Sequence, residues 1–208
     1  MEYQTTLSTE FSSIITPIQL VAGKTAIRFH LPEVAEHPGE VTELMKNETR
    51  LLSGAVQDIQ IVWPIEYEYG TPIIFGIGGT TEQYQLTGWS HQEDGFTWTD
   101  GHNALLALQP ESTDTDLTLT VTTSPYLGGE AIDRQRVFVT VNDHPVGEWV
   151  FDEPGIQEKS IIIPHGVLNE RMQYIAFEMP DAVSPKDLGQ SGDQRDLAIA
   201  VRSMVINC

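Results

Sequence analysis

Hydrophobic and polar residues alternate with a period of two along most of this chain, a pattern typical of β-strands with one buried face. Ile27, Phe29 and Leu31, for example, are separated by single polar residues. Similar segments recur to the end of the chain and are rich in Val, Ile and Thr, which favour strands. The pattern predicts strands at 27–31, 59–63, 117–121, 137–141, 175–179 and 197–201. Compact apolar runs predict further strands at 73–75, 104–108 and 161–163.

Turn signals fall between these segments. Asn142-Asp143 separates the segments 137–141 and 146–151, and both residue types tolerate the positive φ that a tight hairpin requires. Asp100-Gly101 and Gly128-Gly129 predict two more turns. Short strands with turns between them, spaced by about 8–14 residues, are typical of sandwiches. We therefore expect an all-β fold, a mostly antiparallel β-sandwich or jelly roll.

Two segments carry helical signals instead. Apolar residues within 41–53 recur at spacings that share one helical face, which predicts a short amphipathic helix. Ser184 before Pro185 combines an N-cap residue with a proline at the first helical position, which predicts a single helical turn inside a long loop. A domain boundary could fall near 64–70, but strands on both sides share one pattern, so we expect one domain over residues 1–208.

Charge and cysteine content exclude several classes of function. The chain has 30 Asp and Glu residues against 11 Lys and Arg residues, and its formal charge of −19 disfavours binding to nucleic acids or anionic membrane surfaces. Cys208 is the only cysteine, so neither an intramolecular disulfide nor a thiolate metal cluster is available. No apolar run has the length of a membrane span, and the first residues lack the basic region of a signal peptide. We expect no membrane insertion and a cytoplasmic location.

The segment 88–101 concentrates aromatic and acidic residues between glycines. Trp89, Phe96 and Trp98 offer flat faces suited to stacking on sugar rings, and neighbouring carboxylates could bind sugar hydroxyls. The same rings could instead fill a corner of the sandwich core, because an indole buries a large area once its N–H has a partner. We expect Trp89 to point inward and Trp98 to lie closer to the surface. Of the other two tryptophans, Trp63 is a predicted core residue, and Trp149 is expected to form a cross-strand pair in the hairpin.

Evidence for catalysis in the sequence is sparse. The glycine-rich segment 76–80 lacks the lysine and the following helix of a phosphate-binding loop, so we interpret it as a turn. Ser90 and His91 are adjacent in an extended segment and would point to opposite faces, which excludes a local triad. Glu93 and Asp100 could serve as a glycosidase pair if they faced each other at roughly 5–10 Å. A structural calcium ion is a further option for the acidic, glycine-containing loop, although its spacing is not that of an EF-hand.

A resemblance to a known family rests on two motifs. The first is Gly88-Trp89-Ser90 followed by Glu93, Trp98 and Asp100-Gly101, and the second runs from Ser184-Pro185 through Leu188-Gly189 and Ser191 to Asp193 and Arg195. Together they make residues 75–206 similar to a bacterial β-sandwich domain of poorly defined function, often appended to glycosyltransferases and other surface-polysaccharide proteins. Its architecture is similar to that of carbohydrate-binding modules. Residues 1–74 are outside the resemblance and are expected to add strands and a short helix.

The resemblance implies an accessory role linked to saccharides and supplies candidate ligand-binding residues. Asp193 and Arg195 could alternatively hold the loop before residue 197 through a charge-assisted hydrogen bond. We expect a non-catalytic module, without a required cofactor, that binds carbohydrate or a glycan-bearing protein in a polysaccharide-related pathway. One alternative is an assembly subunit, possible as a homo-oligomer, that pairs through strand edges and acidic faces; another is a glycoside hydrolase using Glu93 and Asp100. The candidate ligand-binding residues are Trp89, Glu93, Trp98, Asp100, Gln135, Asn142, Asp193 and Arg195.

Overall fold

The computed structural model describes residues 65–208. The predicted strands at 27–31 and 59–63, the predicted helix at 41–53 and Trp63 lie outside the described residues. The expectation of one domain over 1–208 therefore stays a prediction. In the described part, no helix has the length and apolar character needed to cross a bilayer.

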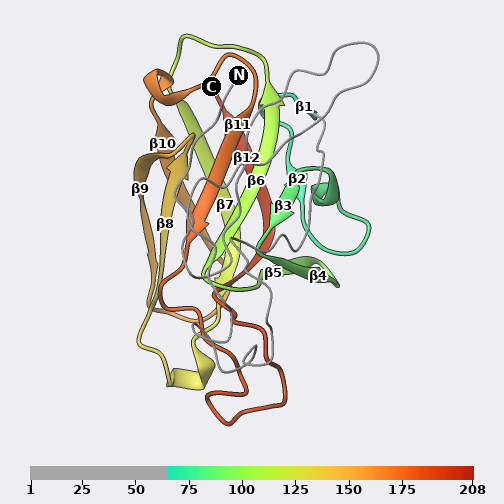
Figure 1. The fold of residues 1–208 in the computed structure, drawn as a ribbon, viewed down its shortest axis with the longest axis vertical. Coiled ribbons are helices and arrows are strands. Elements are labelled where there is room, and N and C mark those ends of the chain that lie inside the picture. Colours follow the sequence, from blue (N-terminus) through green and yellow to red (C-terminus); the bar gives the residue numbers. More distant parts are fainter. Residues whose placement is uncertain (1–64) are drawn as a thin grey trace, which may run out of the picture. The chain divides into compact units, whose positions relative to one another are not determined.

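Two six-stranded β-sheets form the described part, which confirms the all-β prediction. Figure 1 shows β6 and β11 of the first sheet in front of β7 and β12 of the second. The first sheet contains, in spatial order, β1 (Glu66–Tyr67), β6 (Asn103–Pro110), β11 (Gln173–Glu178), β8 (Gln135–Val141) and β9 (His144–Phe151), with β3 (Gln85–Thr87) also paired to β6. The second contains β10 (Gln157–Ile163), β7 (Leu117–Pro125), β12 (Ile199–Asn207), β5 (Phe96–Thr99) and β4 (Trp89–Glu93), with β2 (Ile73–Ile74) also paired to β12.

Strand pairing is antiparallel throughout the described part except between β1 and β6, which run parallel. Of the predicted strands within the described residues, the one at 197–201 is shifted, because β12 begins at Ile199 and Leu197 forms only an isolated bridge with Val183. Short 3-10 turns occur at Thr81–Gln83, Gly128–Glu130 and His165–Val167.

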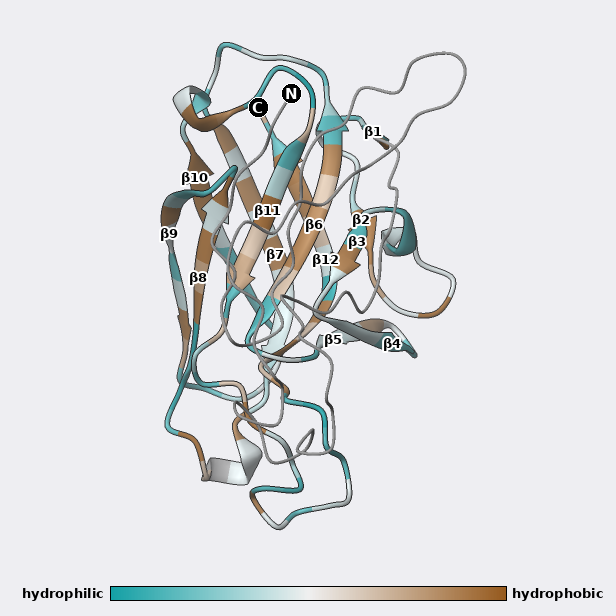
Figure 2. Cartoon of the chain, in the orientation of Figure 1, coloured by the Kyte–Doolittle hydropathy of each residue, from teal (hydrophilic) through white to brown (hydrophobic). Residues whose placement is uncertain are grey.

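The core between the sheets follows the alternation seen in the sequence. In β7, Leu117, Leu119 and Val121 are at most 2% exposed, whereas the residues between them are half-buried on the outer face. Figure 2 shows this as brown and pale bands that alternate along β7. Burying one such aliphatic side chain stabilises a fold by about 1.5–3 kcal/mol, so the repeated inward positions drive the two sheets together.

Two of the predicted turns depend on residues in the left-handed region. Asn142 and Asp143 connect β8 to β9 with φ values of 51° and 66°, the conformation of a tight hairpin turn with two central residues, which confirms that prediction. Gly128 and Gly129 have φ values of 55° and 59° in a 3-10 turn. Both turns reverse the chain where the sequence signals placed them.

The helical turn predicted at Ser184 forms a hydrogen-bonded turn and does not continue as a helix. The Ser184 side chain accepts the Asp187 N–H at 3.0 Å, as an N-cap does, and the Ser184 carbonyl accepts the Leu188 N–H at 3.3 Å. One turn is all that forms, because the chain then bends back at Gly189, whose φ is 69°.

Candidate functional site

The chain passes from one sheet to the other at Gly88. Thr87 pairs with Leu105 in the first sheet, and Trp89 pairs with Thr99 in the second. Gly88 has a φ of 77°, and a Cβ atom there would overlap the backbone of Asn103. The absence of a side chain therefore lets the two crossing backbone segments approach closely.

Trp89 enters the core directly after this crossing, as expected. Its indole N–H donates to the Leu105 carbonyl at 3.0 Å, and its ring lies 5.2 Å from Phe75 and 6.1 Å from Phe177. Phe177 in turn stacks on Trp149 at 6.0 Å, and Trp149 is only 3% exposed. These rings bridge the interior from β4 to β9, so the half-buried Trp89 packs against the core.

A row of three aromatic rings lies on the outer face of the second sheet. Trp98 contacts Phe96 on one side at 5.9 Å and Tyr126 on the other at 6.0 Å, both edge to face. All three rings are half-buried, whereas the alternate residues Thr97 and Thr99 are fully buried on the inner face. Period-two alternation along β5 thus directs Phe96 and Trp98 outward as a pair. We call Phe96, Trp98 and Tyr126 the aromatic row.

Hydroxyl side chains occupy the sheet surface beside the aromatic row. Trp98 pairs with Ala200 of β12, which pairs with Ser124 of β7. Outward hydroxyl positions continue along the same face at Thr122, Thr120 and Thr118 of β7, Ser203 of β12 and Ser160 of β10. An aromatic platform beside many small hydroxyl groups can combine stacking with hydrogen bonding.

Arg195 joins the loop 180–197 to the edge strand β4. Its Nη1 atom donates to Ser90 Oγ at 2.6 Å and to Glu93 Oε1 at 3.1 Å, while Nη2 donates to Asp193 Oδ2 at 2.6 Å. Its Nε atom also donates to Asp193. We call this group of four side chains the Arg195 clamp. The clamp fixes the loop next to the aromatic row, since Gln190 of the same loop accepts the Tyr126 hydroxyl proton at 2.8 Å.

The clamp also shifts the ionisation of its members. Hydrogen bonds from the Arg195 guanidinium and backbone lower the pKa of Asp193 to about 2, and hydrogen bonding to Asp193 raises the pKa of Arg195. The pKa of Tyr126 is raised by partial burial and then by the nearby charge of Asp193. All three groups therefore keep one protonation state over the neutral range.

Three other predicted ligand residues are placed differently. Gln135 is fully buried and donates to the carbonyls of Tyr126 and Asp181 at 2.8 and 3.0 Å. Asn142 bonds to Val167, Gln173 and Tyr174, which connects the β8–β9 hairpin to β11. Asp100 lies in the crossover after β5, where its backbone N–H donates to the Gly88 carbonyl at 2.9 Å. Of the eight predicted residues, the structure brings four together near one surface: Glu93, Trp98, Asp193 and Arg195.

The arrangement of Glu93 and Asp100 does not favour a hydrolytic pair. Glu93 pairs with Phe96 across the β4–β5 hairpin, and Asp100 lies four residues further along the chain. Four residues of extended strand span roughly 13 Å, which exceeds the separation of a glycosidase pair. Glu93 is also held by Arg195.

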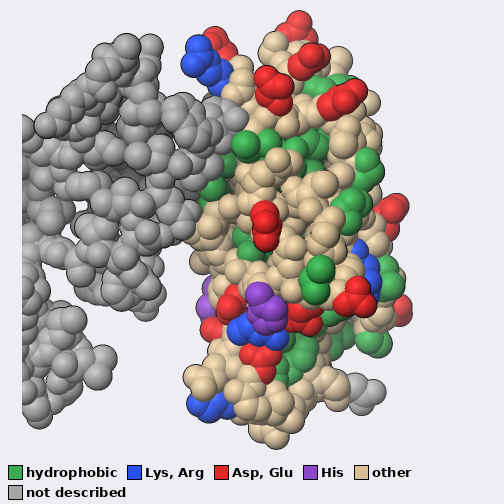
Figure 3. Space-filling view, turned by 90° about the vertical axis from the view of Figure 1, so that its right-hand side faces the viewer, with side chains coloured by type: hydrophobic (Ala, Val, Ile, Leu, Met, Phe, Trp, Pro, Cys, Tyr) green, Lys and Arg blue, Asp and Glu red, His purple; other side chains and the backbone are tan. Residues whose placement is uncertain are grey.

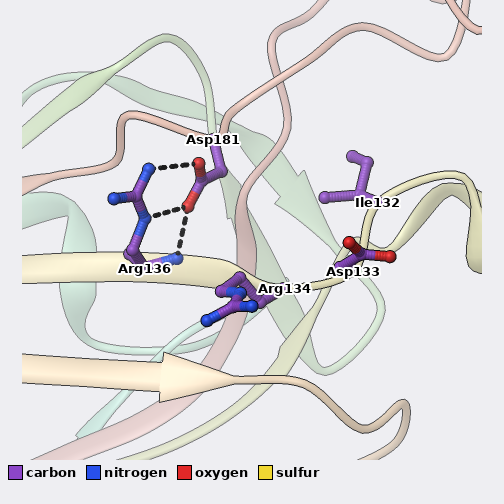
Figure 4. A pocket seen from close by; sticks show the side chains of 5 residues that line it. All are labelled: Ile132, Asp133, Arg134, Arg136 and Asp181. Carbon is purple, nitrogen blue, oxygen red and sulfur yellow. Dashed lines mark hydrogen bonds and ion pairs between the residues drawn. The ribbon is translucent and has the colours of Figure 1, made fainter.

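A surface recess of about 350 Å³ lies near the loop 180–197 (Figure 4). It is lined by Ile132, Asp133, Arg134, Arg136 and Asp181. The Asp181 carboxylate accepts three hydrogen bonds from Arg136, from Nε at 2.8 Å, from Nη2 at 2.7 Å and from the backbone N–H at 3.0 Å. These bonds anchor the start of β8 to the loop that begins after β11.

Across residues 65–208, no three His, Cys, Asp or Glu side chains are grouped in a way that could hold a metal ion.

Tyr126 and Arg202 are the surface residues that sequence reasoning missed. Tyr126 continues the outward positions of β7 by one step beyond Ser124, and Arg202 follows the inward Val201 of β12. The alternation alone could have marked both as outward. Their proximity to Trp98 and Phe96 depends on the pairing of β5 with β12 and of β12 with β7.

No family model matches this chain, and no curated protein sequence does either. Solved structures with a similar arrangement include a family 35 carbohydrate-binding module from Clostridium thermocellum, with a TM-score of 0.42 and 13% identity over 66% of this chain and 98% of that one. Another is the CBM36-1 domain of a multidomain xylanase from the hindgut metagenome of Trinervitermes trinervoides, with a TM-score of 0.40 and 12% identity over 66% and 96% of the two chains. A third is the carbohydrate-binding module CBM36 in complex with calcium and xylotriose, with a TM-score of 0.38 and 13% identity over 66% and 99%.

Proposed function

We propose that this protein is a non-catalytic glycan-binding module whose ligand lies on the aromatic row. The observation that carries the proposal is the alignment of Phe96, Trp98 and Tyr126 as half-buried neighbours on the outer face of a sheet. A sugar ring presents C–H groups on one face and hydroxyl groups at its rim. Aromatic rings can pack on the C–H face, and the Ser and Thr hydroxyls of β7 and β12 can form hydrogen bonds with the sugar hydroxyls.

Rigidity of the surface supports this role. The Arg195 clamp fixes the loop 180–197, and the Tyr126 hydroxyl is held by Gln190 of that loop. Side chains that are ordered before binding lose less conformational entropy on binding, so a modest surface can reach useful affinity. The clamp thus acts as support, with the aromatic row as the contact surface.

The same proposal names surface polysaccharide, or a protein that carries it, as the natural ligand. This context rests on the resemblance of residues 75–206 to domains appended to surface-polysaccharide proteins. A glycan array that includes bacterial surface polysaccharides is the first screen, and calorimetry on the best ligand gives the affinity.

Substitution of Trp98 by Ala tests the proposal. We expect the affinity for that ligand to fall about 10- to 100-fold, the usual loss for one central aromatic contact. Tyr174→Ala is the matched control, since Tyr174 is a half-buried aromatic residue on the outer face of the opposite sheet. The Tyr174→Ala variant should bind the ligand with the same affinity as the wild type.

Two results would overturn the proposal. One is the absence of saturable binding to any glycan by folded wild-type protein. The other is equal affinity of the wild type and Trp98→Ala for a glycan that does bind. A stable oligomer by light scattering, together with a blank array, would favour the assembly function instead.

A further inference from the structure

Arg202 lies on the outer face of β12 next to the aromatic row. It occupies the register shift between Val201 and Ser203, and its guanidinium carbon lies 5.5 Å from the centre of the Phe96 ring. Its Nη1 atom faces the β4–β5 turn near Gly95. Stacking on an aromatic face fixes the plane of a guanidinium group and leaves its N–H edge available for a planar acceptor.

The donors of Arg202 are unmatched within residues 65–208. Its Nε atom is buried and has no hydrogen-bond partner there, and no carboxylate of the described residues lies within ion-pair distance of its guanidinium. Arg195 and Arg136 differ in this respect, because each donates from Nε and from a terminal nitrogen to one Asp carboxylate. Because Nε is buried, the terminal Nη atoms are the donors that a ligand can reach, and they have no hydrogen-bond or ion-pair partner within residues 65–208.

The charge of the chain makes the lack of a partner for Arg202 among residues 65–208 more informative. The chain has 30 acidic residues for 11 Lys and Arg residues, so carboxylates for pairing are abundant. Glu93, which lies opposite Phe96 across the hairpin, is bonded to Arg195. Asp193 is likewise held by Arg195. Neither carboxylate is directed to Arg202.

We propose that Arg202 recognises an anionic substituent, a carboxylate or a sulfate ester, on a glycan bound along the aromatic row. This inference rests on the proposed function and narrows the ligand to acidic glycans. The anion accepts hydrogen bonds from the two terminal Nη atoms of Arg202, while the sugar ring packs beside Phe96 and Trp98. Planar guanidinium groups match such oxyanions with two parallel hydrogen bonds, which gives selectivity as well as affinity.

Matched pairs of ligands test this inference. One pair is an oligogalacturonate and the same oligosaccharide with its carboxylates reduced to alcohols; the other is sulfated and unsulfated dextran oligosaccharide. We expect wild-type protein to bind at least one acidic member about tenfold or more tightly than its neutral partner. The pair that shows the preference distinguishes carboxylate from sulfate.

Two variants assign the preference to Arg202. Arg202→Met keeps a long side chain on Phe96 and should reduce the acidic-to-neutral affinity ratio to about one, without weakening binding of the neutral member. Arg171→Met, at an exposed arginine outside the strands, makes the same change in net charge and should leave the ratio unchanged. Thermal unfolding of both variants confirms that they are folded.

NMR gives a second measurement that separates this inference from the proposed function. Titration with the acidic members should shift the Arg202 Nε–H signal and the Trp98 indole N–H signal together. A Trp98 shift without an Arg202 shift, or an acidic preference that persists in Arg202→Met, overturns the role of Arg202 but leaves glycan binding intact. If neither signal moves with any member of either pair or with the array ligands, both proposals fail.

Discussion

Arg195 Nη1 donates to Glu93 Oε1 at 3.1 Å, although the two residues are 102 positions apart in the chain. Arg195 belongs to the long loop after β11, and Glu93 to the edge strand β4. Asp193 holds the other edge of the same guanidinium group at 2.6 Å. A single side chain thus connects the two motifs that made residues 75–206 resemble a known domain.

The ionisation of Asp193 should report on this clamp. Its pKa of about 2 in the folded protein lies below the usual 3.8, because Arg195 donates hydrogen bonds to its ionised form. The resulting stabilisation is present above pH 4 and is lost as the pH falls from about 4 to about 2. A carboxyl-carbon NMR titration should show the low pKa in the wild type and a value near 4 in Arg195→Gln. Arg134→Gln, which removes an arginine outside the clamp, should not change it. An unchanged Asp193 pKa in Arg195→Gln would disprove the assignment.

Gly88 should be the least replaceable glycine of the aromatic and acidic segment. A Cβ atom at this position would overlap the Asn103 backbone, and the φ of 77° disfavours any other residue. We expect Gly88→Ala to lower the free energy of unfolding by at least about 2 kcal/mol, measured by urea denaturation. Gly101→Ala is the control, since Gly101 has a φ of 100° but open space around its Cβ position. Gly101→Ala should lower the free energy of unfolding by about 1 kcal/mol. Equal losses in the two variants would show that the close backbone approach is unimportant.

Asn142 should contribute to stability and not to ligand affinity. Its side chain accepts the Tyr174 N–H at 3.0 Å and donates to the Val167 carbonyl at 2.8 Å, while its φ of 51° defines the turn. Asn142→Gly retains the backbone conformation and loses these bonds, so we expect a loss of about 1–3 kcal/mol. Asn142→Ala should lose more because it also strains the turn. Calorimetry with the array ligand should give wild-type affinity for both variants if they fold. A tenfold loss of affinity would instead place Asn142 in the binding surface.

Weak hydrolysis would be the clearest contradiction of the non-catalytic function. Glu93→Gln removes the carboxylate of the alternative catalytic pair and loses the ion pair with Arg195. If the wild type cleaves a glycan and this variant does not, Glu93 takes part in catalysis and the non-catalytic function is wrong.

Local patterns in the sequence were sufficient for the elements and for the faces of their side chains. Alternation predicted which residues of β7 point inward, and Asn142-Asp143 predicted the β8–β9 hairpin, because both depend on neighbours a few positions away. The inward direction of Trp89 and the outward direction of Trp98 also followed from their places beside strand patterns. These properties are set by backbone geometry and turn chemistry within single segments.

Strand pairing between distant segments determined which outward side chains lie together on one surface. Trp98 and Tyr126 become neighbours only because β12 lies between β5 and β7, and Arg202 lies beside Phe96 because Val201 of β12 pairs with Thr97 of β5. The same pairing placed Gln135 and Asn142 in structural hydrogen bonds, Gln135 to the Tyr126 carbonyl and Asn142 to the Tyr174 N–H. Period-two alternation specifies the face of a strand but not its neighbour or its register, which depend on packing between segments that are far apart in the sequence. The sequence therefore determined the sandwich and its inner and outer residues, and the tertiary structure alone determined which of the outer residues meet.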